Sequence, residues 1–368
     1  MAPTLLHVFS SFAIGGQQTR FATVANRLGR AFQHRIISLD GRDEAVALLN
    51  PDLDVTVLLV PAQSRNPLVQ LPAIARVSST IRPDVLITYN WGAIEWAIVN
   101  RVRFRRPHIH LEDGFGPDEA DRQKRRRVLA RRFALRLSTV VVPSHGLGEI
   151  ARTVWRLDPS HIIYIPNGID PSRFDRNPAE GGPLHDWRDD ACVIGAFSPL
   201  RPEKNIARLL RAFAELTRSS SSVRLVICGD GPERSPLTEL ARCLNMAERV
   251  TFTGHISQPE SVMGSFDVFA ITSDTEQMPY AVLEAMSARL PVAATAVGDI
   301  PTMVSEENRP FVVERDAPDR LVSVLDQLSR DVSLRLRVGS ANRARVEAKF
   351  RIEPMVESFQ QVLINALA

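Results

Sequence analysis

The sequence predicts an α/β protein with two parallel-sheet domains, and three observations carry this prediction. Short runs rich in β-branched residues alternate with segments of helical periodicity through most of the chain. The alternation stops once, at Arg176–Asp190, a stretch rich in proline, glycine and charge, and then starts again. The length of 368 residues is about two and a half typical domains of roughly 150 residues.

Seven short apolar runs in the first half are expected to form strands. They are Leu5–Phe9, Arg35–Leu39, Val55–Val60, Val85–Tyr89, His108–Leu111, Thr139–Val142 and Ile162–Ile165. Helices are expected between most of them. The clearest is Gln17–Leu28, whose apolar stripe recurs at i, i+3, i+4 and i+7 from Phe21.

The pattern restarts after the break. The expected strands are Cys192–Phe197, Val223–Cys228, Val268–Thr272 and Pro291–Ala294, and the expected helices are Asn205–Leu216, Pro236–Met246, Pro279–Ala288, Pro318–Leu328, Val332–Lys349 and Glu353–Ala368. We expect an N-terminal domain over 1–178, a linker over 179–190, a C-terminal domain over 191–350, and a helix over 351–368 that packs back on the N-terminal domain. Two such sheets imply a cleft lined by loops at the carboxyl ends of strands.

The composition is that of a globular protein. Hydrophobic residues make up 44% and charged residues 24% of the chain, which excludes the pattern of disorder. No stretch approaches the roughly 18 apolar residues of a membrane-spanning helix. The first residues also lack the basic start and long apolar run of a signal peptide, so we expect a cytoplasmic protein. Cys192, Cys228 and Cys243 match no disulfide, metal or redox pattern.

Positive charge is concentrated in one segment. The net charge of +3 argues against a dedicated nucleic-acid binder, but Arg122–Arg136 holds eight basic residues and no acidic one. Leu129, Phe133 and Leu137 recur there at every fourth position. This pattern is typical of a helix that lies on an anionic membrane surface. The alternative is a solvated helix whose apolar stripe enters the core.

Two glycines, Gly15 and Gly16, follow the first predicted strand at the start of a helix. Paired glycines there let backbone N–H groups approach an anion at the positive end of the helix dipole. A plain tight turn is the alternative. The dinucleotide pattern G-x-G-x-x-G is absent.

Arg201 and Lys204 follow the first strand of the second half and precede a helix. A planar guanidinium fork and a point charge both suit the oxygens of a diphosphate, and the helix adds its dipole. Lysine is rare here, since the chain has three lysines among 45 basic residues. Two exposed loop cations are the alternative.

Two carboxylates, Glu276 and Glu284, frame the start of a later helix. Pro279 suits the first helical position, so Glu276 lies in the loop and Glu284 lies inside the helix. A carboxylate accepts two hydrogen bonds from a vicinal diol of a ribose or hexose, and nearby N–H groups can address phosphate or hydroxyl oxygens. The ordinary alternative is a helix-start charge and a solvated face.

In order and spacing, these segments resemble the retaining glycosyltransferases of family 4. The resemblance covers nearly the whole chain and rests on IGGQQTR, VVPSHGLGEIA, YIPNGIDPSRF, IGAFSPLRPEKNIARLLRAFAEL, LVICGDGPE, VTFTGHI and SDTEQMPYAVLEAMSARLPVAATAVGDIPTMV. The last is similar to the E-x7-E motif of that family. The resemblance implies the GT-B fold, in which two Rossmann-like domains face each other across a cleft. It also implies transfer of a sugar from a nucleotide diphosphate sugar with retained anomeric configuration, no metal ion and no further cofactor.

The resemblance assigns roles to single residues. Glu284 is similar to the ribose ligand of the family, Glu276 to the ligand of the donor sugar's hydroxyls, and Lys204 to the diphosphate cation. Gly15 and Gly16 would close over the phosphates. Further donor contacts are expected from two backbone segments, namely Gln277 with Met278, and Gly254, His255 and Ile256 near the base.

Two positions depart from the family pattern. The family has arginine where this chain has Pro199, so Arg201 is expected to reach the diphosphate instead. The family has a histidine before a glycine, touching the donor sugar, where this chain has Asp113 before Gly114. We expect Asp113 to replace that histidine. His110, three residues earlier, is either a second catalytic contact or an ordinary strand residue.

The function expected from the resemblance is a metal-independent retaining hexosyltransferase. It would use a UDP-sugar and a lipid-linked or saccharide acceptor in envelope polysaccharide or glycolipid synthesis, in the cytoplasm or at the inner face of the cytoplasmic membrane. The leaving diphosphate would take the proton of the acceptor. The alternatives are a GT-B-fold sugar-nucleotide epimerase, a catalytically silent relative, and a nucleic-acid binder that uses the arginine-rich segment.

Overall fold

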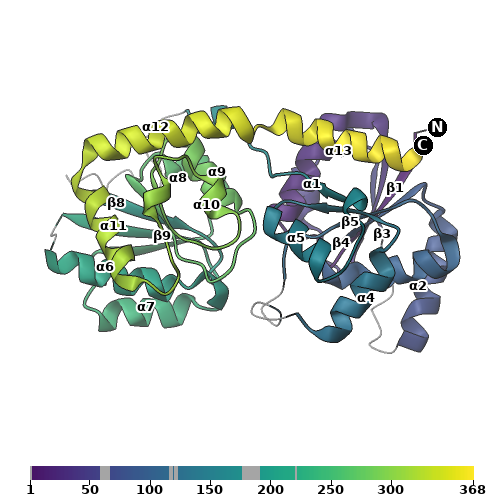
Figure 1. The fold of residues 1–368 in the computed structure, drawn as a ribbon, viewed down its shortest axis with the longest axis horizontal. Coiled ribbons are helices and arrows are strands. Elements are labelled where there is room, and N and C mark those ends of the chain that lie inside the picture. The colour runs from purple at the N-terminus through teal and green to yellow at the C-terminus, as the bar shows by residue number, and fades with distance from the viewer. Residues whose placement is uncertain (1, 59–66, 116–118, 120–122, 176–190, 220–221) are drawn as a thin grey trace. The chain divides into compact units, whose positions relative to one another are not determined.

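Figure 1 shows the fold of the computed structural model, which describes residues 2–58, 67–115, 119, 123–175, 191–219 and 222–368. The α/β class and the two parallel sheets are confirmed. Contacts divide the chain into two units. Unit 1 runs to Gly168 and resumes at Ile352, whereas unit 2 is Ile169–Arg351.

Unit 1 is built on a parallel sheet of seven strands within the described residues, in the order β3-β2-β1-β4-β5-β6-β7. The strands are β1 (Thr4–Phe9), β2 (Gln33–Ser38), β3 (Val55–Leu58), β4 (Val85–Tyr89), β5 (His108–Leu111), β6 (Thr139–Val142) and β7 (Ile162–Tyr164). The α-helices are α1 (Gly16–Leu28), α2 (Pro67–Ile81), α3 (Ile94–Val99), α4 (Arg125–Leu135), α5 (His145–Thr153) and α13 (Ile352–Leu367). Leu5 and Phe9 pack in one apolar cluster and Leu6 and Val8 in another. Burial on both faces explains why these strands read as continuous apolar runs.

The last helix, α13, packs beside α1 within unit 1 (Figure 1). Its apolar residues Met355, Phe359 and Leu363 are buried in the same cluster as Phe21 of α1. The helix that the sequence predicts over 351–368 thus begins at Ile352 and completes the core of unit 1.

Unit 2 is built on a second parallel sheet, with six strands within the described residues in the order β10-β9-β8-β11-β12-β13. The strands are β8 (Cys192–Phe197), β9 (Val223–Cys228), β10 (Val250–Gly254), β11 (Val268–Ile271), β12 (Val292–Thr295) and β13 (Val312–Val313). The α-helices are α6 (Ile206–Ser219), α7 (Arg234–Cys243), α8 (Glu260–Met263), α9 (Tyr280–Ser287), α10 (Ile300–Met303), α11 (Pro318–Arg330) and α12 (Val332–Lys349). The sequence pattern does not predict β10 and β13, which lie at the two edges of the sheet.

The boundary between the units lies earlier than the sequence predicts. Ile169 forms a parallel bridge with Arg351, and both Ile169 and Phe174 are buried in an apolar cluster of unit 2. Burial of these side chains places residues 169–175 in unit 2 rather than in the predicted first domain. The predicted linker, 179–190, lies outside the described residues.

In each sheet the strand order reverses beside the strand that comes first in its unit. The reversal lies between β1 and β4 in unit 1 and between β8 and β11 in unit 2. Connections from two such strands turn to opposite faces of the sheet and leave a crevice at their carboxyl ends, where α/β sheets bind ligands. Within each unit, the loops that carry most of the predicted site residues therefore follow strands at or next to this reversal.

Buried histidines tie the strands of unit 1 together. His7 Nδ1 lies 3.0 Å from Tyr89 Oη, and His7 Nε2 lies 3.0 Å from His34 Nδ1. Burial lowers the pKa of His34 from 6.5 to about 4 and holds the pKa of His7 well below its usual value. Both rings are therefore neutral at pH 7 in the folded state.

We expect acid to destabilise unit 1 through these rings. Because the folded state holds His34 at a lowered pKa, unfolding takes up a proton below pH 6.5, and stability falls as the pH falls from 6.5 toward 4. Each pH unit costs roughly 1.4 kcal/mol, so His34 alone lowers the free energy of unfolding by about 2 kcal/mol at pH 5. Urea unfolding at pH 7.5 and pH 5 measures this change.

The change should be smaller in His34→Gln and unaltered in His255→Gln, because His255 is exposed. Equal acid sensitivity of the wild type and His34→Gln would contradict the prediction.

Candidate functional site

The site in unit 2 begins where β8 ends. The chain passes through Ser198–Arg201 into a short 3-10 turn, Pro202–Lys204, and then into α6. Asn205 closes the turn in the left-handed conformation, with φ of 43°, which asparagine tolerates better than most residues. Its side-chain amide donates to the two oxygens of Asp274 at 3.0 and 3.2 Å. This contact ties the loop after β8 to the loop after β11.

Arg208 reinforces the same tie. Its Nη2 lies 2.7 Å from Asp274 Oδ1, and its Nη1 donates to the carbonyl oxygen of Thr272 at 2.7 Å. The N–H of Asp274 donates to the carbonyl oxygen of Glu203 at 2.8 Å. The two loops therefore form one polar frame at the strand-order reversal of unit 2.

Within this frame the structure brings Lys204 and Glu276 together. Lys204 Nζ lies 2.6 Å from Glu276 Oε1, which also accepts a hydrogen bond from Ser273 Oγ at 2.7 Å. The two side chains are 19% and 8% exposed, so solvent reaches the pair without surrounding it. When a ligand binds, the lysine can exchange the carboxylate for a phosphate, and the carboxylate can exchange the lysine for a hydroxyl group.

The backbone before α9 is fixed by the close approach of Gly298. This residue has φ of +56°, and a Cβ there would lie 2.3 Å from the carbonyl oxygen of Glu276, so the position requires glycine. The N–H of Asp299 donates to the carbonyl oxygen of Gln277 at 2.8 Å. Gln277 and Met278, two predicted donor contacts, therefore lie in a fixed segment in which the Met278 side chain is buried.

Glu284 lies on the second turn of α9 and is only partly accessible. Burial raises its pKa from 4.5 to about 7, while the positive charge of Arg173 opposes the rise and the negative charge of Glu260 adds to it. Arg173 and Glu260 pair with each other at 2.5 Å. A carboxyl group that titrates near neutral pH can change its charge when a ligand binds.

The remaining predicted donor contacts of unit 2 lie on neighbouring loops. Gly254 ends β10 with φ of +78°, and its carbonyl oxygen accepts a hydrogen bond from the N–H of Gly229 at 2.8 Å. His255 is exposed and Ile256 is half-buried. The Arg201 side chain is exposed, and no hydrogen bond or ion pair with a described residue holds it. Contact of Arg201 with a diphosphate therefore stays a prediction.

In unit 1, Gly15 and Gly16 form the start of α1. Gly15 is the N-cap residue with extended backbone, φ −168°, and no side chain caps the helix. The first N–H groups of a helix have no intrahelical acceptor, so here they face solvent or an anion at the positive end of the dipole.

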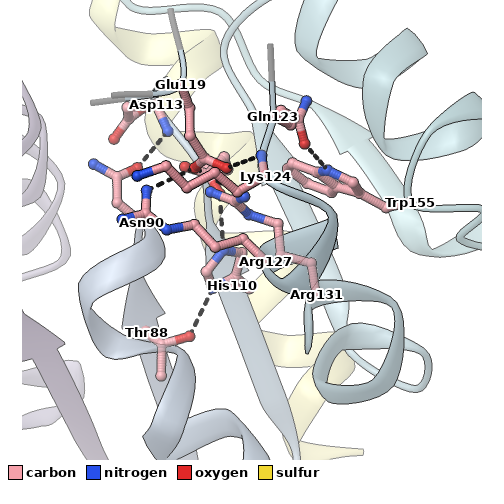
Figure 2. A network of polar contacts seen from close by, with 11 residues as sticks. Thr88, Asn90, His110, Asp113, Glu119, Gln123, Lys124, Arg127, Arg131 and Trp155 are labelled. Atoms are coloured by element: carbon pink, nitrogen blue, oxygen red, sulfur yellow. Dashed lines mark hydrogen bonds and ion pairs between the residues drawn. The ribbon is translucent and has the colours of Figure 1, made fainter. Parts of the chain in front are cut away.

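Asp113 follows β5, and side chains of α1 bind it. Arg20 donates to both carboxylate oxygens, at 2.5 and 2.8 Å, and Gln17 Nε2 lies 2.5 Å from Oδ2. The N–H of Asp113 donates to Asn90 Oδ1 at 2.7 Å, a pair labelled in Figure 2. Arg20 is 2% exposed and also donates to Asn167. Contact of Asp113 with a sugar stays a prediction, and its carboxylate is already occupied by α1.

The role predicted for His110 needs correction. Its side chain is fully buried in β5, with Nδ1 2.8 Å from Thr88 Oγ1 (Figure 2). Its Nε2 lies 3.6 Å from Glu112. A side chain without exposed surface cannot touch a substrate in this conformation. His110 is therefore an interior strand residue, the second of the two interpretations above.

The basic helix buries one of its arginines. Arg131 has no exposed surface and lies 3.1 Å from Glu112. It also lies 3.4 Å from Glu119 (Figure 2). Three aromatic rings surround its guanidinium at 5.0, 5.3 and 5.0 Å, namely Trp91, Phe115 and Trp155. Carboxylates and rings thus replace water around a buried cation. Arg122, the first residue of the predicted basic segment, lies outside the described residues.

The apolar stripe of this segment faces outward. Leu129, Phe133 and Leu137 are 62%, 48% and 74% exposed. The alternative in which the stripe enters the core is therefore wrong, because α4 buries Arg131 and Leu135 instead.

Arg20 ends the segment IGGQQTR and Arg131 lies in the basic segment, but neither is among the site residues predicted from the sequence. A signal exists for Arg20, which stands four residues before Val24 and eight before Leu28 and so lies on the apolar face of the predicted helix. For Arg131 the sequence offers no comparable signal, because its partners come from segments far apart in the chain.

Over the part of the chain that the structure describes, no group of three or more His, Cys, Asp or Glu side chains is arranged to hold a metal ion. Nor does any helix in that part combine the length and the apolar character needed to cross a membrane. All three cysteines are free, with Cys192 and Cys228 buried and Cys243 exposed.

Two family models match the chain. The one described as Glycosyltransferase Family 4 matches residues 14–173, and the one described as Glycosyl transferases group 1 matches residues 185–345. The first range includes Asp113, and the second includes Lys204, Glu276 and Glu284.

Curated relatives match part of the chain. It is 26% identical over 239 residues to the N-acetyl-alpha-D-glucosaminyl L-malate synthase of Bacillus anthracis, with 64% of this chain and 62% of the relative covered. It is 29% identical over 213 residues to the GDP-mannose-dependent alpha-(1-6)-phosphatidylinositol monomannoside mannosyltransferase of Mycobacterium tuberculosis, with 55% of each covered. The chain thus spans less than two thirds of the length of these relatives.

A solved structure shares the fold. HepE of Anabaena, in complex with UDP and glucose, superposes with a TM-score of 0.82 at 20% identity, covering 99% of this chain and 100% of HepE. This likeness identifies the two Rossmann-like parallel-sheet domains as those of the GT-B fold. With both family models matched in order along the chain, the protein belongs to glycosyltransferase family 4.

Proposed function

We propose that this glycosyltransferase moves a sugar, with retained configuration, from a nucleotide diphosphate sugar to a lipid-linked or saccharide acceptor in glycolipid or envelope polysaccharide synthesis. UDP is the favoured nucleotide. The observation that carries the proposal is the Lys204–Glu276 pair at the strand-order reversal of unit 2, with Glu284 eight residues later. A cation for a diphosphate beside two carboxylates for diols fits the chemistry of a nucleotide sugar. The proposed reaction uses no metal ion and no further cofactor.

Each group has its own task in this proposal. Lys204 neutralises the diphosphate, which frees Glu276 to accept hydrogen bonds from hydroxyls of the sugar. Glu284 accepts hydrogen bonds from the ribose hydroxyls. The exposed Arg201 side chain supplies a second cation to the diphosphate. The backbone N–H groups of Gln277 and Met278, the loop at Gly254, His255 and Ile256, and the helix start at Gly15 and Gly16 complete the proposed donor contacts.

The proposed reaction occurs on one face of the sugar. The bond from C1 to the phosphate oxygen breaks, the acceptor oxygen bonds to C1 from the same side, and the leaving diphosphate takes the proton of the acceptor. Negative charge grows on the diphosphate as its bond breaks. Fixed cations such as Lys204 stabilise that charge without reorganisation at the moment of reaction, the electrostatic contribution that is usually largest.

The exposed apolar stripe, which begins on α4 and ends just after it at Leu137, supports a membrane-bound acceptor. Leu129, Phe133 and Leu137 stand exposed, and the guanidinium of Arg101 lies over the Phe133 ring at 4.8 Å. Apolar side chains beside arginines fit an anionic bilayer surface, where the rings and chains enter the interface and the cations meet lipid phosphates. One curated relative is named for a phosphatidylinositol monomannoside acceptor, which agrees with this proposal.

Lys204→Ala is expected to lower kcat by about 100-fold, because a fixed cation is lost where charge develops. The assay measures release of UDP from UDP-glucose, or of GDP from GDP-mannose, with phosphatidylinositol vesicles as acceptor. Lys349→Ala is the matched control, since Lys349 is exposed at the end of α12.

An unchanged rate in Lys204→Ala would refute the assignment of this lysine. Conversion of the donor sugar without any acceptor would instead indicate an epimerase.

Donor binding is expected to strengthen as the pH rises from 6 to 8 and then to level off. The ribose hydroxyls donate to the ionised form of Glu284, whose pKa is about 7 without ligand, so binding at pH 7 releases part of a proton. Calorimetry with UDP-glucose in buffers of different ionisation enthalpy measures the release.

Glu284→Gln should abolish this pH dependence. Glu260→Gln should move the rise to lower pH, because it removes a negative charge that raises the pKa of Glu284. Proton release that persists in Glu284→Gln would assign the titration to another group.

The protein is expected to sediment with vesicles that contain phosphatidylglycerol and to be released by salt. Phe133→Ser with Leu137→Ser should weaken this binding about 10-fold, since each replacement removes apolar area from the interface. Val332→Ser with Leu336→Ser is the matched control on exposed apolar residues of α12. Equal sedimentation with vesicles of phosphatidylcholine alone would contradict the electrostatic part of the proposal.

A further inference from the structure

Gln17 stands in the first turn of α1, directly after the glycine pair, and its side chain is held in one orientation. Its Nε2 donates to Asp113 Oδ2 at 2.5 Å, and a carboxylate can only accept, so the amide nitrogen must face Asp113. The side chain is half-buried, which leaves it accessible from one side.

Asp113 is itself fixed and neutralised. The Arg20 guanidinium binds both carboxylate oxygens, and the backbone N–H of Asp113 is bound by Asn90. Arg20 is buried and is held on its other side by Asn167. The carboxylate therefore has little capacity left for a ligand, and its geometry serves to orient the amide of Gln17.

The carbonyl oxygen is the other polar atom of the Gln17 side chain. With Nε2 committed to Asp113, Oε1 points away from the carboxylate, and no described residue donates to it. A carbonyl oxygen repels phosphate oxygens and accepts from hydroxyl groups. Its neighbours Gly15 and Gly16 offer N–H groups suited to a phosphate, and in a nucleotide sugar the hydroxyl-bearing ring is joined directly to that phosphate.

We propose that Gln17 accepts a hydrogen bond from a hydroxyl of the donor sugar, and that Asp113 and Arg20 are its positioning residues. The inference rests on the proposed use of a nucleotide sugar. It assigns to Gln17 the sugar contact that the resemblance to the family leads us to expect from Asp113.

Calorimetric affinities separate this contact from phosphate and nucleoside contacts. The probes are UDP, UDP-glucose, GDP and GDP-mannose, titrated into the full chain. Gln17→Ala should weaken binding of the nucleotide sugar by about 5-fold and leave the nucleoside diphosphate unchanged, since one neutral hydrogen bond is lost. Gln18→Ala is the matched control, because that amide donates to the carbonyl oxygen of Ser11 within the same turn.

Deoxy analogues of the bound donor sugar identify the partner hydroxyl. Removal of that hydroxyl should weaken binding to the wild type, whereas Gln17→Ala should bind the analogue and the parent sugar equally. A double variant tests the positioning role: Arg20→Lys should weaken sugar binding, and Gln17→Ala with Arg20→Lys should be no weaker than Gln17→Ala alone. Thermal unfolding of each variant confirms that the fold is retained.

Each outcome supports or overturns a distinct statement. If the wild type binds none of the four nucleotides, the proposed function fails. If it binds them and Gln17→Ala weakens sugar and diphosphate ligands alike, or neither, the contact to the sugar is overturned. If the Arg20→Lys and Gln17→Ala effects add, Arg20 does not act through Gln17.

Discussion

The reversal of strand order in each parallel sheet is the constraint on which both candidate sites depend. It leaves the carboxyl ends of two neighbouring strands uncovered by helices, and loops with different chemistry meet there. In unit 2 the contacts from Asn205 and Arg208 to Asp274 fasten those loops, so that Lys204 and Glu276 lie 2.6 Å apart. The same topology in unit 1 places the start of α1 beside the ends of β4 and β5.

Buried guanidinium groups stabilise the loops of unit 1 in a different way. Arg20 and Arg131 are almost wholly removed from water, and each is compensated by carboxylates and aromatic or polar neighbours. Removal of one partner of such a pair costs about 3–5 kcal/mol, because the remaining charge stays buried. Glu112 and Asp113 are therefore held firmly at the end of β5, and the helix that carries Arg131 presents apolar side chains to solvent.

Much of the fold follows from local pattern, and much of the site does not. Strands buried on both faces read as apolar runs, whereas the edge strand β10 buries only Val250 and escapes detection. The positions of Glu276 and Glu284 around the start of α9 follow from their spacing. The pairing of Lys204 with Glu276 joins residues 72 apart and depends on the frame that Asn205 closes, which no local pattern reveals. The contact of His110 with Thr88 likewise joins two strands whose register no local pattern reveals.

Glu112 and Asp113 are consecutive, yet the first binds Arg131 of α4 and the second binds Arg20 of α1. Their side chains leave the backbone toward opposite sides, as neighbouring residues do in extended chain. A single-residue insertion or deletion just after β5 would turn each carboxylate toward the opposite side. Both guanidinium groups would then lose their counter-charge at once. This short stretch therefore tolerates replacement by isosteric residues far better than any change in its length.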